Sequence, residues 1–537
     1  MNNIKNIISK IDLFTLRDLV GLTILRALDN NERGTDSNAI SDLLVMKFGN
    51  QILSNVDIRR DIIYSFSEEE AKGLCNDLGL SGDAFLELSK YFKAYSFAKS
   101  KILVEHLNLD NDYFLKVSND DREPSELITT KFGEEIKSLG FPHPYQKKIK
   151  NKIAQRLSQK TEKYFFVQMP TGSGKTFTAL ETAVDLLRGE SISKNREKRF
   201  VVWLVDSNEL AEQSFQSFKK LWKQKGDREI KAFRFFKDFE PNFFNENEGF
   251  VFAGFAKIFQ MLESSHKGHS NFMELVNNTE YLIVDEAHHA SAATYMPTIN
   301  KFKNTPFVKI MGLSATPGRS DPKETPELIG MFSGDRLFME DDKGKELPDA
   351  IKTLQDGQYL AKLKTEILKT NIDAETIPEG RLMDFLASNS DRNQVIIDQI
   401  KIANDLKELT LVFACSIDHV YALHILCQEN NIVSEYIIGD VLQEDRLKML
   451  ERFKEKEFFI LINLDILSTG IDIPTVNRLI LSRPIKSPIL TSQILGRALR
   501  GKNNGGNEIN TIINLKDNIK EYPGLSFLYN FFDQDWN

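Results

Sequence analysis

Short, continuously apolar segments recur along most of this chain, and stretches with the pattern of amphipathic helices separate them. A first series comprises KYFFVQM, RFVVWLV, GFVFAGF, YLIVDE and KIMGLSAT, and a second comprises LTLVFAC, SEYIIGD, FFILINLD, VNRLILS and TIINL. Strands that are apolar on both faces belong to parallel sheets covered by helices on each side. The sequence therefore predicts an α/β fold with two parallel-sheet lobes in tandem.

Residues 1–130 follow a different pattern. Segments such as IDLFTLRDLVGLTILRAL place apolar residues at i, i+3, i+4 and i+7, which is typical of amphipathic helices. The polar, proline-containing stretch VSNDDREPSE (117–126) indicates a boundary. We therefore expect an all-helical N-terminal domain over residues 1–130. The other expected parts are a first lobe at 131–320, a linker at 321–380, a second lobe at 381–515 and a C-terminal tail at 516–537.

Charge and composition exclude several classes of protein. The chain has a net charge of −8, and 15 Lys and Arg against 21 Asp and Glu place −6 of it in residues 1–130. Binding to phosphates would therefore need a local groove rather than overall charge. No apolar run approaches the roughly 18 residues that span a bilayer. Because such a run is missing, we expect no membrane segment. The three cysteines have no C-x-x-C spacing, so we expect neither a zinc module nor disulfides, and a protein of the reducing cytoplasm.

MPTGSGKT (169–176) follows an apolar run and precedes a helical pattern. Glycines in such a loop let backbone N–H groups approach phosphate oxygens at a helix start. Lys175 would reach the β- and γ-phosphates of ATP, and the Thr176 hydroxyl would bind Mg²⁺. The general pattern has glycine where this chain has Met169. The residues that we assign to ATP binding here are Gly172, Ser173, Gly174, Lys175 and Thr176.

YLIVDEAHHA (281–290) predicts a buried strand that ends in two carboxylates. Asp285 is suited to hold Mg²⁺, and Glu286 is the natural base or water-orienting group beside a γ-phosphate. The vicinal histidines His288 and His289 cannot form the i, i+4 chelate of a helical metal site. We therefore predict a site for ATP and Mg²⁺ and no further metal.

Eight motifs in a fixed order resemble those of superfamily 2 helicases, and are most similar to the restriction-enzyme-like DEAH group that includes type I and type III restriction motors. The resemblance covers roughly residues 140–515 and implies two RecA-like lobes that hydrolyse ATP while moving on nucleic acid. The motifs are FPHPYQ (141–146), MPTGSGKT, VDSNELAEQ (205–213), VDEAHH, LSATPGR (313–319), LVFACSIDHV (411–420), INLDILSTGIDIP (462–474) and QILGRALRG (493–501).

The resemblance also implies roles for particular residues of the first lobe. Gln146 would read the adenine edge, with Tyr145 or Phe141 nearby as a stacking surface. The residues that would link hydrolysis to movement between the lobes are His288, Ser314 and Thr316.

In the second lobe, the resemblance implies that Gly470 and Asp472 touch the nucleotide and that Gln493 positions the attacking water. Arg497 and Arg500 would be arginine fingers. Because these arginines are three residues apart on an expected helical segment, they should share a face. Their charges would meet a γ-phosphate held by the first lobe, so hydrolysis would depend on lobe closure.

The polymer and the partners are less constrained. RNA-directed DEAD-box proteins carry a P-T-R-E-L motif and an H-R-x-G-R ending, which differ from VDSNELAEQ and QILGRALR, so we expect DNA rather than RNA. The strand that grips nucleic acid in the family reads VFAGFAKIF (251–259) here, where Lys257 could supply the contact. We expect a DNA helicase or translocase, with the motor subunit of a restriction, defence or DNA-repair assembly as one context for it. An RNA helicase, or an ATP-gated switch that recruits a partner without movement, are the alternatives.

The acidic segment 1–130 has three possible roles: a cap on the first lobe, a docking surface for a protein partner, or a nucleic-acid sensor. A docking surface predicts that a chain beginning near residue 125 stays soluble and active. A cap predicts that the same chain aggregates, because removal of a cap exposes apolar surface.

Overall fold

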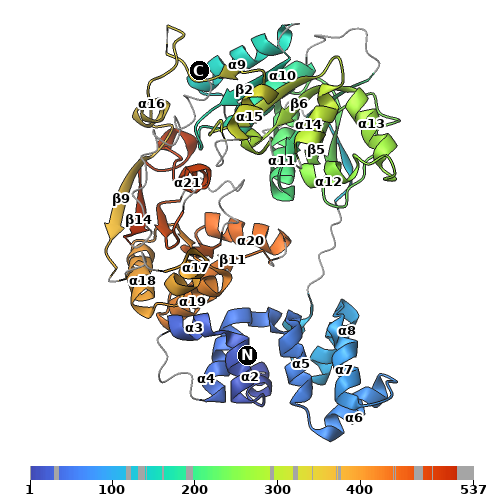
Figure 1. Cartoon of the computed structure of the whole chain (residues 1–537), viewed down its shortest axis with the longest axis vertical. Helices are drawn as coiled ribbons and strands as arrows, with labels where there is room; N and C mark the ends of the chain where they lie inside the picture. Colours follow the sequence, from blue (N-terminus) through green and yellow to red (C-terminus); the bar gives the residue numbers. More distant parts are fainter. Residues whose placement is uncertain are drawn as a thin grey trace.

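In the computed structural model, two parallel-dominated sheets follow a bundle of helices (Figure 1). The expected fold class, two tandem α/β lobes behind a helical N-terminal segment, is confirmed. The structure describes residues 2–28, 36–115, 122–130, 140, 142–159, 163–188, 198–290, 295–318, 324–341, 343–370, 372, 377–439, 441, 443–464, 476–485 and 488–516.

The first sheet has eight strands in the order β1-β4-β5-β3-β6-β7-β2-β8, and all pair in parallel except β1 with β4. Along β3, Val201 and Trp203 join one apolar cluster, whereas Val202 and Leu204 join another on the opposite face. The strands are β1 (Ser125–Ile128), β2 (Tyr164–Gln168), β3 (Arg199–Val205), β4 (Ile230–Phe235), β5 (Glu248–Gly254), β6 (Thr279–Val284), β7 (Lys309–Ser314) and β8 (Arg336–Leu337).

Helices cover both faces of this sheet, as the apolar runs predict. Leu180 of α10 and Phe215 of α11 pack into the cluster on one face, and Phe272 of α13 and Phe302 of α14 pack into the other. The helices of this lobe are α9 (Pro144–Ser158), α10 (Lys175–Arg188), α11 (Asn208–Lys225), α12 (Phe255–Gln260), α13 (His269–Asn277), α14 (Met296–Lys303) and α15 (Thr325–Met331).

The second sheet has six parallel strands in the order β11-β12-β10-β13-β14-β9. Ile460 and Ile462 of β12 face α18 and α19, whereas Leu461 faces α20 and α21. The strands are β9 (Lys362–Leu368), β10 (Thr410–Phe413), β11 (Ser434–Ile437), β12 (Ile460–Asn463), β13 (Arg478–Leu481) and β14 (Ile509–Leu515). The helices are α16 (Ala350–Asp356), α17 (Glu379–Ala387), α18 (Ser390–Asp405), α19 (Ile417–Glu429), α20 (Gln443–Lys454) and α21 (Pro488–Gly496).

The N-terminal helices pack against the second lobe rather than the first (Figure 1, blue against orange). Ile24 and Leu44 belong to one apolar cluster with Val420 and Leu423 of α19. The elements are α1 (Asn2–Ile8), α2 (Leu13–Val20), α3 (Leu22–Ala27), α4 (Ser37–Phe48), α5 (Val56–Tyr64), α6 (Glu68–Asp77), α7 (Ala84–Lys93) and α8 (Phe97–His106), with short 3₁₀ turns at Gly49–Ser54 and Asn111–Tyr113. The prediction that these helices cap the first lobe is therefore wrong, because they pack on the second lobe.

Lys47, at the end of α4, lies at the centre of this contact. Its ammonium donates to the carbonyl oxygen of Val20 (3.0 Å) and lies 3.8 Å from Asp418 of α19. It also lies 5.2 Å from the ring centroid of Tyr421. The Tyr436 hydroxyl of β11 donates to the Lys47 carbonyl oxygen (3.1 Å). The two parts thus share polar contacts as well as an apolar core.

Three strands lie beyond the boundaries that the sequence predicts. β1 falls within 1–130, yet it pairs with β4 of the first sheet. β8 and β9 fall within the expected linker 321–380, yet they are edge strands of the first and second sheets. These edge strands are short or half-exposed, so they lack the continuous apolar pattern of the central strands.

A buried arginine fixes β1 to the first lobe. The Arg234 side chain is 1% exposed, and its guanidinium donates to Glu212 (2.8 and 3.0 Å), to Glu126 (2.6 Å) and to the carbonyl oxygen of Glu123 (3.0 Å). A buried guanidinium needs such a set of acceptors to offset its loss of hydration. The segment that leads out of the N-terminal helices is therefore held firmly at the edge of the first sheet. No helix in the described ranges has the length and apolar character needed to cross a bilayer.

Deletion of residues 1–121 is expected to make the chain aggregate. The deletion uncovers the apolar residues of α19 that the N-terminal helices bury, and a large exposed apolar patch promotes association. Light scattering of the purified chain, compared with the full-length protein, tests this. A monomeric, folded protein beginning at residue 122 contradicts the prediction.

Candidate active site

The phosphate loop joins β2 to α10. Gly172 and Gly174 have φ values of 80° and 82°, a region that suits glycine, and α10 begins at Lys175. Met169, at the position where the general pattern has glycine, is buried in the apolar core. Its N–H donates to the carbonyl oxygen of Ser314 at the end of β7 (3.2 Å). The strand–loop–helix arrangement that the sequence predicts for phosphate binding is present.

Gln146, on α9, is hydrogen-bonded to the backbone of the phosphate loop. Its side chain is buried, its Oε1 accepts from the N–H of His143 (2.8 Å), and its Nε2 donates to the carbonyl oxygen of Ser173 (2.9 Å). The Tyr145 hydroxyl donates to the same carbonyl oxygen (2.8 Å). A Cβ on Gly174 would lie 2.5 Å from Gln146 Nε2, so glycine is required there. Gln146 thus positions the loop; its expected contact with adenine stays a prediction.

Three rings meet beside this loop. The centroids of Tyr145 and Tyr359 are 5.0 Å apart, and those of His143 and Tyr359 are 4.7 Å apart. Asn504 of the second lobe joins the group, because its Oδ1 is 2.8 Å from His143 Nε2 and its Nδ2 donates to the Tyr359 carbonyl oxygen (2.8 Å). The sequence identified Tyr145 but not Tyr359 or Asn504, which lie outside the eight motifs given above. Phe141 lies outside the described residues.

The two carboxylates lie at the end of β6, next to the phosphate loop. Asp285 is buried, and the Thr176 hydroxyl donates to its Oδ2 (3.2 Å). Glu286 has φ 48° and ψ 47°, a left-handed conformation that costs a residue with a Cβ some strain and clusters at functional sites. Its Oε1 lies 3.8 Å from the Lys175 ammonium. The structure therefore brings all four of these predicted residues together.

Burial and charge separate the pKa values of the two carboxylates. Burial, with a contribution from the neighbouring Glu286 carboxylate, raises the pKa of Asp285 to about 6. Burial also acts to raise the pKa of Glu286, but the Lys175 ammonium and the His288 ring outweigh it and lower that pKa. Glu286 is therefore ionised, whereas the Lys175 charge and the hydrogen bonds from Thr176 and the Glu286 N–H offset the effect of burial on the pKa of Asp285 only in part.

Thr176 and Asp285 fit a magnesium ion. Both offer oxygen atoms, and Mg²⁺ is commonly bound by one or two protein oxygens, several waters and substrate phosphates. Among the described residues, no three or more His, Cys, Asp or Glu side chains form a metal cluster. The pair is thus suited to a cation that a nucleotide shares, rather than to a closed protein site.

The three residues assigned to coupling also meet. His288 Nδ1 lies 2.9 Å from Ser314 Oγ and 3.3 Å from Glu286 Oε2. Ser314 Oγ donates to the carbonyl oxygen of Thr316 (3.0 Å) and accepts from the Thr316 N–H (3.1 Å). Because the Ser314 proton goes to Thr316, we assign the proton of the His288–Ser314 bond to His288 Nδ1. The loop after β7 is thereby joined to Glu286.

The second lobe touches the phosphate loop directly. A Cβ on Gly172 would lie 3.2 Å from Leu499 Cβ, and a Cβ on Gly496 would lie 2.0 Å from Thr171 Cγ2. Only glycine fits at Gly496. The hydroxyls of Thr171 and Ser492 are 3.3 Å apart. The phosphate loop therefore lies in the interface between the lobes.

The expectation that Arg497 and Arg500 share a helix face is wrong. α21 ends at Gly496, Arg497 follows in a turn, and Arg500 forms an isolated antiparallel β-bridge with Leu360, a residue just before β9. Arg497 is among the charges that lower the pKa of Glu286 against the effect of burial. Burial raises the pKa of Tyr145, and the Arg500 charge opposes that rise. The two arginines thus act on opposite ends of the site.

The other residues that the sequence assigned to the nucleotide or to nucleic acid are Gln493, Gly470, Asp472 and Lys257. Gln493 lies on α21 and is half-buried. Gly470 and Asp472 lie outside the described residues. Lys257 of α12 is paired with Glu240 (3.0 Å), so its side chain is engaged within the lobe.

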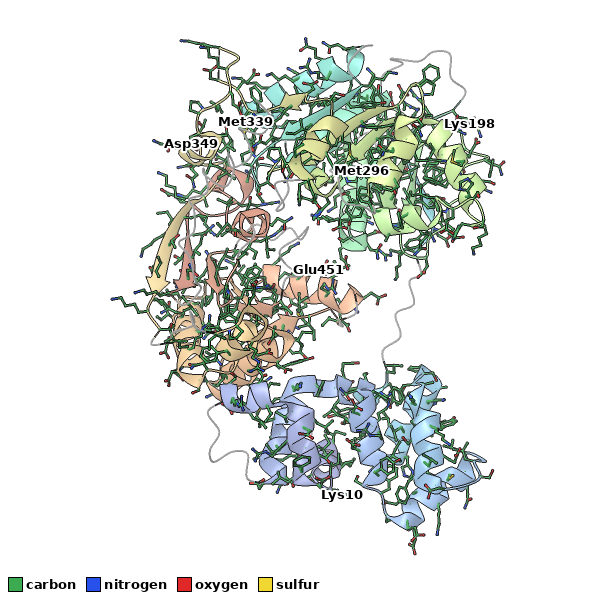
Figure 2. All side chains as sticks on the ribbon, in the orientation of Figure 1. Lys10, Lys198, Met296, Met339, Asp349 and Glu451 are labelled. Atoms are coloured by element: carbon green, nitrogen blue, oxygen red, sulfur yellow. The ribbon has the colours of Figure 1, made fainter. Side chains whose placement is uncertain are left out.

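A second contact between the lobes was missed by sequence reasoning. Arg446, in the first turn of α20, donates to Glu209 in the first turn of α11 (3.0 Å), and its side chain is largely buried. Figure 2 labels Glu451 on α20, at the side of the second lobe that faces the first. In the sequence, this ion pair is represented only by a glutamate in VDSNELAEQ and an arginine in QEDRLK, and nothing in either segment indicates that the two meet.

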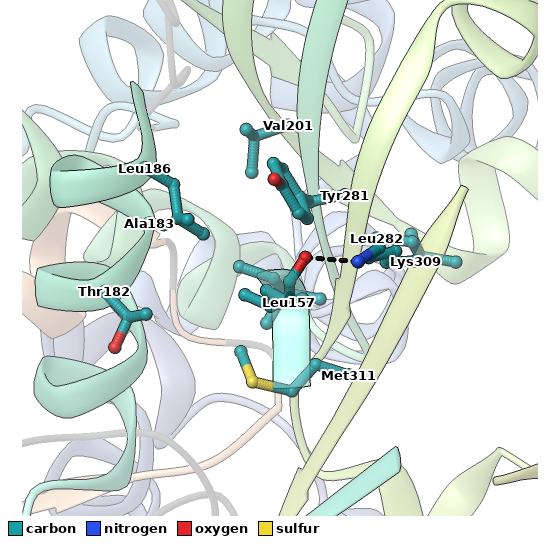
Figure 3. A pocket seen from close by; sticks show the side chains of 10 residues that line it. Leu157, Thr182, Ala183, Leu186, Val201, Tyr281, Leu282, Lys309 and Met311 are labelled. Carbon is teal, nitrogen blue, oxygen red and sulfur yellow. Dashed lines mark hydrogen bonds between the residues drawn. The ribbon is translucent and has the colours of Figure 1, made fainter. Parts of the chain in front are cut away.

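The small cavity in Figure 3 is not part of this site. It has a volume of about 10 Å³ and lies inside the first lobe, where Leu157 and Ala183 face Val201, Tyr281 and Met311 of the sheet. That volume corresponds to about one water-sized sphere. The cavity is a packing gap in the core and adds no ligand site.

Comparisons with known proteins agree with this geometry. The family model described as "Type III restriction enzyme, res subunit" matches residues 141–319, and the one described as "Helicase conserved C-terminal domain" matches residues 391–502. Together, the two matches extend over more than half of the 537 residues.

Individual relatives are distant. Helicase 22, as assigned in Sulfolobus islandicus filamentous virus, is 27% identical over 383 residues, which are 69% of this chain and 64% of that protein. The protein assigned as ATP-dependent helicase IRC3 in Saccharomyces cerevisiae is 27% identical over 340 residues, 62% of this chain and 46% of that protein. The chain therefore spans about half to two thirds of the length of these curated relatives.

Among solved structures, a fragment assigned to an HsdR subunit of a type I restriction enzyme from Vibrio vulnificus YJ016 has a TM-score of 0.50 and 20% sequence identity. The match covers 70% of this chain and 64% of that one. This likeness supports the fold.

Lys175→Ala is expected to weaken binding of Mg·ATP by about 10- to 100-fold, because a charged hydrogen-bond partner is worth roughly 1.5–3 kcal/mol. Titration with a fluorescent ATP analogue measures the affinity. The exposed Lys72 of α6, paired only with Glu68, provides the matched control Lys72→Ala. Equal affinity in the two variants contradicts the assignment of this loop.

Proposed function

We propose that this chain, which belongs to the superfamily 2 helicases and has a restriction-enzyme-like first lobe, is an ATP-driven motor that moves along DNA. One observation carries the proposal. Lys175, Asp285 and Glu286 of the first lobe lie at a phosphate loop that the second lobe also touches, and the Arg497 charge is close enough to help lower the pKa of Glu286. ATP bound there would contact both lobes at once.

The residues of the first lobe divide the chemistry among them. Bound Mg·ATP supplies the phosphoanhydride bond whose hydrolysis drives the motor. Lys175 would balance the charge of the β- and γ-phosphates, and Thr176 and Asp285 would hold Mg²⁺. Glu286 is ionised and close to Lys175, so it can accept a proton from an attacking water.

The second lobe would complete the site only when the lobes are closed. Arg497 would stabilise the charge that develops on the γ-phosphate, with Gln493 beside the attacking water. Arg500 lies nearer Tyr145, so we assign it to binding of the nucleotide rather than to the reacting phosphate. Opening and closing once per ATP would then move the lobes along the polymer.

DNA is the proposed polymer, because the first-lobe family model is that of a restriction enzyme subunit. Within such an assembly this chain would be the motor, and a partner would supply any nuclease. Helices α5–α8, which extend beyond the second lobe in Figure 1, are the proposed docking surface for that partner. Three buried free thiols, at Cys75, Cys415 and Cys427, suit a cytoplasmic location.

Arg497→Ala should lower kcat for ATP hydrolysis by roughly 10³-fold or more, which is the scale of an arginine finger. Arg500→Ala should mainly raise KM for ATP, because its charge lies at the Tyr145 end of the site. Steady-state kinetics of the two variants separate these effects. Indistinguishable kcat values for the two variants would contradict the division of roles.

ATP hydrolysis should be stimulated by single- or double-stranded DNA, and less by RNA of matched length. Phosphate contacts release counterions, so the stimulation should require more DNA as salt rises. Steady-state ATPase assays with each polymer, at two salt concentrations, measure this. Glu286→Gln is the matched control: it should retain binding of Mg·ATP and DNA but hydrolyse very slowly. Stimulation by RNA alone favours an RNA helicase, and stimulation without movement on a tethered DNA favours an ATP-gated switch.

A further inference from the structure

Tyr295 lies at the carboxyl end of the first sheet, among the segments that follow three of its strands. β5, β3 and β6 are neighbours in that sheet. Asp206 directly follows β3, Phe255 directly follows β5, and His289 lies in the turn after β6. Because carboxyl ends of parallel strands meet at one edge, these residues surround Tyr295, which precedes α14 (Figure 2 labels the next residue, Met296).

Tyr295 is fixed on three sides. Its hydroxyl donates to the Asp206 carboxylate. Its ring stacks on Phe255, with centroids 4.0 Å apart and planes at 24°, and Phe255 is itself buried in the core. His289 contacts the ring edge-on, with centroids 6.1 Å apart and planes at 89°. A ring held in this way cannot shift without moving its neighbours.

The contacts continue from His289 to the reacting groups. The rings of His289 and His288 lie 4.2 Å apart. His288 Nδ1 then reaches both Ser314 Oγ (2.9 Å) and Glu286 Oε2 (3.3 Å). Each step from Asp206 to Glu286 is therefore a direct contact between side chains.

The other end of this series lies where the lobes face one another. Asp206 is exposed and precedes Ser207, the N-cap of α11. Glu209, three residues after Asp206, forms the ion pair with Arg446 of the second lobe. A polymer phosphate that enters between the lobes beside α11 would repel the Asp206 carboxylate, and would move the Tyr295 hydroxyl that is bonded to it.

We propose that Tyr295 is a positioning residue that transmits binding of the polymer between the lobes to Glu286. The inference rests on the proposed function, because it assigns to Tyr295 the coupling of DNA binding to hydrolysis. Without polymer, Asp206 and Phe255 hold the Tyr295 ring in one place. When polymer displaces Asp206, the Tyr295 ring bonded to it moves as well, and the ring contacts with His289 and His288 carry that movement to Glu286.

The test measures ATP hydrolysis with and without saturating single-stranded DNA in the full-length chain. Tyr295→Ala removes both the ring and the hydroxyl, and Tyr295→Phe removes only the bond to Asp206. We expect the DNA-free rate and the Kd for DNA to stay within about twofold of wild type in both. The stimulation by DNA should fall about tenfold in Tyr295→Ala, within the range of allosteric couplings. Tyr295→Phe should show a smaller fall.

A double-mutant cycle checks that the hydroxyl acts through Asp206. If the two side chains act together, Tyr295→Phe combined with Asp206→Asn should lose no more stimulation than the stronger single variant. Phe244→Ala, at another exposed aromatic residue of the first lobe, is the matched control and should be stimulated like wild type.

The outcomes separate the two proposals. A wild-type chain that no polymer stimulates contradicts the proposed function and the coupling role with it. A stimulated wild type with an equally stimulated Tyr295→Ala variant contradicts the coupling role alone. A Tyr295→Ala variant that loses affinity for DNA makes Tyr295 a binding residue instead, and one that loses the DNA-free rate makes it part of the fold of the site. Either result overturns the coupling role.

Discussion

The close approach of Thr171 to Gly496 determines how the rest of the site is arranged. A side chain at either Gly172 or Gly496 would separate the phosphate loop from the second lobe. Because these glycines remove that obstacle, Lys175 and the carboxylates of one lobe come within range of the arginines of the other. The first lobe thus holds Lys175 and the two carboxylates, the second lobe holds the two arginines, and neither lobe has the whole set alone.

The chain joins its parts in an order that differs from their order in space. The N-terminal helices come first in the sequence but share a core with the second lobe, through Ile24, Lys47 and α19. The next segment then returns to the first lobe as β1, which Arg234 fixes to the sheet edge. The chain therefore enters the first lobe from helices that pack on the second lobe, and leaves the first lobe to form the second.

The sequence predicted those features whose residues are neighbours in the chain, and missed those whose residues are brought together only by folding. The phosphate loop, the strand before Asp285 and the two-sheet fold could be predicted from short stretches of sequence. The glycines of the loop and the apolar runs of the strands each reflect a requirement of the residues next to them in the chain. Tyr359 and Asn504 could not be found in this way, since they reach the site through tertiary packing. The expectation that Arg497 and Arg500 share a helix face failed for a related reason: the helix ends at Gly496, where contact with the other lobe replaces the next helical turn.

The N-terminal helices lie on the far side of the second lobe from the phosphate loop (Figure 1). When a rigid body pivots, its distant end travels through a longer arc than the part beside the pivot. A slight turn of the second lobe about Gly496 would therefore become a wide sweep at α6 and α7. Because the bundle shares an apolar core with α19, such a rotation would displace these helices further than it displaces the residues beside the phosphate loop.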